Sequence, residues 1–144
     1  MESFLEEKNP NSIVGKALIK SKEQICSSFK INESQFDYIA ENFKIRSELS
    51  GHNNQVCLVD FCDEDGRLLG GVCVKYSFED KMLPGLLLET DILDLFSTSQ
   101  VISPRVLGTD LSTQSDFIYV ITTVAEGHPV TNYKLQIDDI EKRL

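Results

Sequence analysis

Apolar and polar residues alternate most clearly over residues 55–76, where two runs rich in Val, Leu, Phe and Cys flank Asp65-Gly66. Asp-Gly between such runs predicts a β-hairpin with a two-residue type I′ turn, which needs positive φ at both central residues. In that register Val59 faces Val72 on an apolar face that is expected to look into the core. The other pairs set by the same register include Cys57 with Val74, Phe61 with Gly70, and Glu64 with Arg67.

Helical periodicity precedes the hairpin, over residues 12–46. The strongest stripe has apolar residues at i, i+3, i+4 and i+7, namely Phe36, Ile39, Ala40 and Phe43, which predicts an amphipathic helix. Asn32 with Gln35 resembles a capping box at its start. Two shorter helices are expected before it, capped by Ser12 and Ser21, after a loose leader over residues 1–11.

The pattern after the hairpin predicts further elements of both kinds. They are a short helix over 91–97 capped by Thr90, an edge strand at 106–107, an apolar central strand over 117–125, a half-buried strand over 130–137, and a helix over 140–144. The fold class is therefore predicted as α+β. N-terminal helices precede an antiparallel sheet of about four or five strands, which is built from two hairpins with a short helix between them and ends in a short C-terminal helix.

Length and charge set the class of protein. A chain of 144 residues predicts one domain, residues 1–144, with a leader (1–11), a helical part (12–46) and a sheet-containing part (55–144). The net charge is −9, and residues 51–144 hold seven Lys and Arg against fifteen Asp and Glu. An acidic surface repels nucleic acid and anionic membranes and attracts basic proteins. An acidic start and the lack of a long apolar run predict a cytoplasmic protein whose cysteines stay reduced.

The sequence offers little for a metal or a catalytic centre. Cys57 and Cys62 are an odd number of residues apart, so on one strand they point to opposite faces and cannot share a zinc ion. A calcium loop with Gly66 at its sixth position would need ligands at Phe61 and Val72. The nucleophile motifs Gly-x-Ser-x-Gly and Gly-x4-Gly-Lys-Ser/Thr do not occur. We therefore expect no cofactor, no metal and no enzymatic activity.

These properties favour a non-catalytic protein-interaction module that binds and neutralises or escorts a basic partner, such as a toxin or a secreted effector. The acidic, cofactor-free α+β profile is similar to that of immunity proteins, and the element order resembles that of secretion chaperones. The expected contact residues are the acidic side chains of and beside the hairpin, namely Asp60, Asp63, Glu64, Asp65, Glu79 and Asp80.

Two alternatives follow from other features. A pocket between sheet and helices would suit a small-ligand-binding or enzymatic domain. Residues 23–43 have the outline of a helix-turn-helix, but the second helix would present Glu33, Asp37 and Glu41 where a DNA reader needs Arg, Lys, Asn or Gln.

Overall fold

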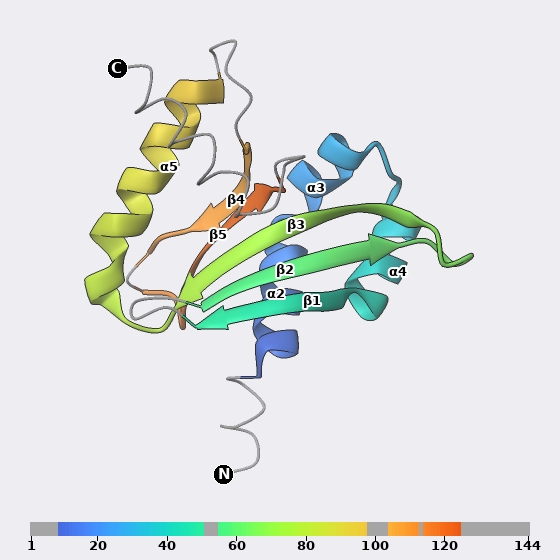
Figure 1. Ribbon diagram of the computed structural model, residues 1–144, viewed down its shortest axis with the longest axis horizontal. Coiled ribbons are helices and arrows are strands. Elements are labelled where there is room, and N and C mark those ends of the chain that lie inside the picture. Colours follow the sequence, from blue (N-terminus) through green and yellow to red (C-terminus); the bar gives the residue numbers. More distant parts are fainter. Residues whose placement is uncertain (1–8, 51–54, 98–103, 113, 125–144) are drawn as a thin grey trace, which may run out of the picture.

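The computed structural model describes residues 9–50, 55–97, 104–112 and 114–124 (Figure 1). The helices are α2 (Pro10–Lys20), α3 (Lys22–Phe29), α4 (Glu33–Asn42) and α5 (Leu83–Ser97), with a 3-10 turn η1 (Asp80–Met82) before α5. The strands are β1 (Lys44–Ser50), β2 (Gln55–Cys62), β3 (Leu68–Ser77), β4 (Val106–Asp110) and β5 (Ile118–Thr123). The prediction of an α+β fold, with helices before a five-stranded antiparallel sheet, is confirmed.

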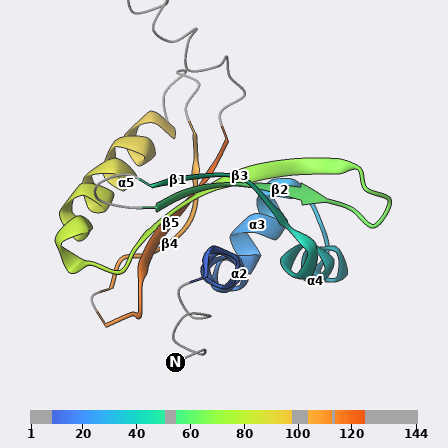
Figure 2. The ribbon, with the colours of Figure 1, turned by 60° about the horizontal axis from the view of Figure 1, so that its bottom comes forward.

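The sheet has the strand order β1-β2-β3-β5-β4, and every neighbouring pair is antiparallel. The chain leaves β3 through α5, enters the sheet again at the β4 edge and returns as β5 between β3 and β4. Helices α2, α3 and α4 lie together on one side of the sheet, and α5 lies at the other end, beside β4 and β5 (Figure 2). The sheet is thus covered on both faces, but by different helices over different strands.

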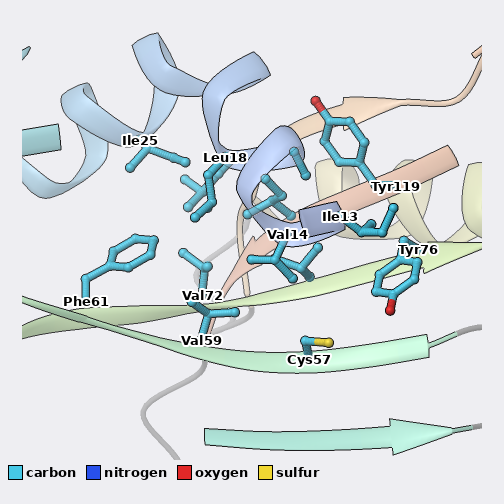
Figure 3. Close-up of a cluster of buried hydrophobic side chains, with 14 of the residues drawn as sticks. Ile13, Val14, Leu18, Ile25, Cys57, Val59, Phe61, Val72, Tyr76 and Tyr119 are labelled. Carbon is cyan, nitrogen blue, oxygen red and sulfur yellow. The ribbon is translucent and has the colours of Figure 1, made fainter. Parts of the chain in front are cut away.

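The larger core lies between the sheet and α2, α3 and α4 (Figure 3). It joins Val14, Leu18 and Ile25 of the helices to the inward residues of the strands, such as Val59 and Val72, all 0% exposed. Successive residues of a strand point to opposite faces. Alternate residues of β5 therefore serve a second, smaller core, in which Ile118 and Val120 pack against Leu86 of α5.

Local capping explains where the first three helices begin. Asn9 accepts a hydrogen bond from the Asn11 backbone N–H at 2.9 Å, and Pro10 occupies the first turn, so α2 begins before the predicted cap at Ser12. Ser21 precedes α3, but its side chain does not cap that helix and instead lies 3.2 Å from the Tyr119 hydroxyl. The predicted capping box of Asn32 and Gln35 is confirmed at the start of α4.

The predicted register of the β2–β3 hairpin is confirmed from Val56–Lys75 to Phe61–Gly70. The predicted two-residue type I′ turn is wrong. Asp65 does not have positive φ, whereas Gly66 has φ 82°. The Gly66 N–H donates to the Asp63 carbonyl at 3.0 Å and the Asp63 N–H to the Arg67 carbonyl at 2.9 Å. The loop therefore holds three residues, 64–66, and a bulge on β3 before Gly70 restores the register. Glu64 consequently does not pair with Arg67.

Three other elements differ from the prediction. Residues 44–50 form the edge strand β1, where the sequence predicted the end of the helical part. Helix α5 begins at Leu83 rather than near residue 91, and the Thr90 hydroxyl donates to the Leu86 carbonyl within the helix. The second hairpin joins β4 to β5, and β5 has β3 on its other side. The strand predicted over 130–137 and the helix predicted over 140–144 lie outside the described residues.

Candidate functional site

The end of the β2–β3 hairpin carries three consecutive acidic residues, Asp63, Glu64 and Asp65. The Asp63 side chain is half-buried, and its Oδ1 accepts hydrogen bonds from the backbone N–H groups of Asp65 at 2.9 Å and Arg67 at 2.8 Å. Side chains that bond their own turn in this way fix the backbone of a loop. Asp63 thus holds the loop, and Glu64 and Asp65 are both exposed at its end.

A cavity of about 290 Å³ separates this loop from α4. One wall is the acidic loop, and the other is a strip of α4 with Ser34, Gln35 and Tyr38; Leu69, at the bulge of β3, completes the lining. Ser34 and Tyr38 are four residues apart and therefore lie on one side of the helix. We call this cavity and its acidic wall the hairpin-tip site.

The described lining of the hairpin-tip site combines acidic residues with one tyrosine. Within the described residues, no Lys or Arg forms an ion pair with Glu64 or Asp65. Tyr38 adds an aromatic ring on the opposite wall, and guanidinium or ammonium groups bind both to carboxylates and over aromatic faces. A Lys or Arg side chain of a partner would therefore meet two carboxylates and one ring here.

The remaining expected contact residues lie elsewhere. Asp60 lies on β2, where its Oδ1 is 3.5 Å from Nε of Arg46 on the neighbouring edge strand. Glu79 follows β3 and pairs with Lys81 at 3.3 Å. Asp80 begins η1, and its side chain lies outside the described part. Ten residues of β3, at about 3.3 Å each, separate the hairpin tip from Glu79 by about 30 Å. The six predicted contact residues therefore form two separate groups, one at the hairpin tip and one after β3, with Asp60 between them.

The histidines and cysteines of the chain are placed as follows. His52 and His128 lie outside the described residues. The four cysteines are free thiols, and Cys57 is buried in the larger core, where desolvation raises its pKa to about 11. Cys73 lies on the opposite face of the sheet, and burial also raises its pKa. In the described ranges, no three His, Cys, Asp or Glu side chains gather closely enough to hold a metal ion.

Helices α3 and α4 form the helical hairpin that the sequence indicated, with a left-handed Lys30 between them. The side chains of Glu33, Asp37 and Glu41 are all exposed on α4. Lys22 pairs with Glu33 at 2.6 Å, which lowers the pKa of Glu33 and raises that of Lys22. No helix in the described part of the chain is long and apolar enough to cross a membrane.

Comparison with known proteins gives no relative: no family model, no curated protein and no solved structure matches this chain. The site can therefore be interpreted only from its own geometry. Sequence reasoning found the acidic wall of the hairpin-tip site but missed Ser34, Gln35 and Tyr38. Their contribution depends on a contact between α4 and a loop about 30 residues away, and no local pattern signals it.

Proposed function

We propose that this protein is a non-catalytic interaction module that binds a basic partner protein through the hairpin-tip site and neutralises or escorts it. The observation that supports this most directly is the cavity shared by Glu64, Asp65 and Tyr38. The acidic surplus of the whole chain, −9, supports it further because long-range attraction speeds the capture of basic proteins.

Different residues should determine the rate of association with the partner and the stability of the complex. The exposed carboxylates of Glu64 and Asp65 would steer the approach, so their loss should lower the association rate. Tyr38 and Leu69 would contact the bound side chain at short range, so their loss should raise the dissociation rate. Asp63 must be kept in any such test, since its carboxylate holds the loop.

The experiment begins with affinity capture from a lysate of the source organism, followed by identification of the partner and kinetics with both proteins purified. The double variant Glu64→Lys/Asp65→Lys should lower the association rate about tenfold at low salt and less at high salt, because screening removes the long-range attraction. The control is Glu79→Lys, which reverses one charge, at an exposed acidic residue about 30 Å from the hairpin-tip site.

Two outcomes would contradict the proposal. One is a captured partner without a basic surface. The other is a logarithmic change in association rate that is half as large in the Glu79→Lys control, which reverses one charge, as in the double variant, which reverses two, because the attraction would then come from net charge alone. Circular dichroism and urea unfolding of each variant check that the fold is unchanged.

A small cationic ligand is the second candidate, favoured by the size of the cavity, about 290 Å³, which is at the lower end of ligand pockets. Titration with free arginine or spermidine, followed by NMR of the Tyr38 ring, separates the two candidates. Saturable binding at micromolar concentration that Tyr38→Leu abolishes would favour the small ligand. Binding only at tens of millimolar would leave the protein partner as the occupant.

A further inference from the structure

A second cavity lies between α3 and the start of β4, two elements that pack beside each other. It is an open groove of about 670 Å³, which is within the size range of small-ligand sites. Helix α3 lines it with three exposed polar side chains, Gln24, Ser27 and Ser28. The described linings of this groove and of the hairpin-tip site have no residue in common, so an inference from the groove does not rest on the proposed function.

The charged residues of the groove are separated along its length. Helix α3 touches β4 at its start, because a Cβ on Gly108 would overlap the Ser21 hydroxyl. From this contact α3 runs about 13 Å to Lys30, and the chain leads back from Gly108 by about 10 Å to Arg105. Both cations therefore lie away from the contact, whereas Glu23 follows Ser21 by two residues and lies close to it.

Lys30 and Arg105 give the groove two cations that can receive an anion. Within the part of the chain that the structure describes, neither of them forms an ion pair, although the sequence has 23 acidic residues against 14 basic ones. A guanidinium binds a phosphate through two parallel N–H groups, and an ammonium adds a compact charge. The hydroxyl groups of Ser27 and Ser28 supply further donors beside them.

The backbone at Lys30 supports a functional role for this residue. Its φ of 55° and ψ of 48° are left-handed, and no other non-glycine residue in the described ranges has positive φ. A side chain is disfavoured in this conformation, and glycine is the usual residue at such a helix end. Strained residues of this kind cluster at ligand sites. At this helix end the residue that glycine would replace at a lower cost is one that brings an ammonium group to the groove.

We infer that the groove binds a phosphate monoester of a hydroxylated compound, such as a sugar phosphate. Lys30 and Arg105 hold the phosphate group. Gln24 and Glu23 bind the hydroxyl groups of the ligand nearer the contact between α3 and β4, where the Glu23 carboxylate would repel a second anionic group. Val106 and Leu107 add apolar surface for the carbon skeleton.

NMR titration of the full chain with glucose 6-phosphate, glucose and inorganic phosphate tests the inference. Glucose 6-phosphate should shift the amide signals of Ser27, Ser28 and Val106 and should bind at least about tenfold more tightly than inorganic phosphate, because only the ester also contacts Gln24 and Glu23. Glucose alone should not bind with saturation below about 10 mM.

Three variants separate binding from stability. Lys30→Gly should raise the dissociation constant of glucose 6-phosphate about tenfold and also raise the urea midpoint, since it removes the cation and relieves the left-handed backbone. Arg105→Gln should weaken binding to a similar extent. The matched control is Lys16→Gln, which changes the net charge equally at an exposed α2 residue that forms no ion pair in the described part.

Three results would overturn the inference. They are the absence of saturable binding of glucose 6-phosphate up to about 10 mM, equal affinities for glucose 6-phosphate and inorganic phosphate, and equal effects of Arg105→Gln and Lys16→Gln. Urea unfolding of each variant shows that a loss of binding is not a loss of the fold. Failure to capture a basic partner would overturn the proposed function and leave these titrations unchanged, so the two proposals fail separately.

Discussion

At the scale of single residues, Gly70 is the point where α3 approaches the hairpin. Its φ is +153°, and a Cβ placed there would lie 2.5 Å from Cε1 of Phe29. The Phe29 ring also meets Phe61 edge to face, with 5.4 Å between the ring centroids. The sequence predicted that Gly70 pairs with Phe61 of β2, which is confirmed, and the structure brings the ring of Phe29 to this glycine from α3.

Gly70→Ala should lower the free energy of unfolding by about 2–4 kcal/mol, because the methyl group must displace the Phe29 ring and the backbone is strained for any other residue. Urea denaturation measures the change. The control is Gly85→Ala on α5, where a Cβ meets nothing within 4 Å and where alanine should stabilise by up to about 1 kcal/mol. Equal losses in the two variants would show that the contact with Phe29 does not matter.

Cys57 gives a prediction about alkaline pH. Desolvation, with a smaller effect of Glu48, raises its pKa from 9.0 to about 11. Between these two values the unfolded chain releases a proton that the folded chain retains, so stability present below pH 9 is lost as the pH rises. The loss should reach about 2–3 kcal/mol near pH 11. Burial raises the pKa of Tyr76 to about 12, so this tyrosine adds to the fall above pH 10.

Urea unfolding from pH 8 to pH 11 measures this dependence. Cys57→Ala should be less stable at pH 8 because a buried group is lost, but its stability should fall less steeply between pH 9 and pH 11. A curve of the same slope in the variant would mean that another group carries the titration.

At the scale of elements, α4 depends on its start. The Asn32 side chain accepts from the Gln35 N–H at 2.8 Å, and the Gln35 side chain accepts from the Asn32 N–H at 2.9 Å. Asn32→Ala should therefore lower the free energy of unfolding by about 1 kcal/mol. Asn42→Ala, at the other end of the helix, should change it by no more than a few tenths of that. Because α4 forms one wall of the hairpin-tip site, binding of the basic partner should weaken in Asn32→Ala and not in Asn42→Ala.

Sequence patterns predicted the elements that neighbouring residues determine. The capping box, the stripe of α4 and the central pairs of the β2–β3 hairpin depend on neighbouring residues, and they are confirmed. The edge strand β1 was missed because it has only two large apolar residues, Ile45 and Leu49, and Lys44, Arg46 and Glu48 make it strongly charged. Such charges, together with the bulge between Ile45 and Ser47, protect an open sheet edge from pairing with other chains.

Elements that depend on distant contacts were less predictable. Residues 86–88 are three consecutive leucines, and a strand and a buried helix can both have such a run. The structure resolves it into α5, with Leu86 inward and Leu87 and Leu88 outward at 44% and 61% exposure. The hairpin-tip site was also only partly predictable. Its acidic loop can be recognised in the sequence, but its wall on α4 depends on a contact between distant residues.

At the scale of the whole molecule, two cores of unequal size lie on opposite faces of one sheet. The larger joins α2, α3 and α4 to β2, β3 and β5. The smaller consists of Leu86, Ile118 and Val120, with Met82, Leu83, Val106 and Leu111 packed around it. A region with fewer buried apolar contacts opens at a lower cost in free energy. Helix α5 should therefore open before the three N-terminal helices do.

Leu86→Ala should make that difference measurable by hydrogen exchange. Truncation of a buried leucine costs about 2–4 kcal/mol, and here the cost should fall on the smaller core. Amide protection should drop across α5, and that of α2 and α4 should stay close to the wild-type value. Ile25→Ala, in the larger core, should lower protection throughout α2, α3 and α4, since those helices share one core. A uniform drop in both variants would mean that the sheet unites the two cores into one cooperative unit. Helix α5 would then be as rigid as the rest of the molecule.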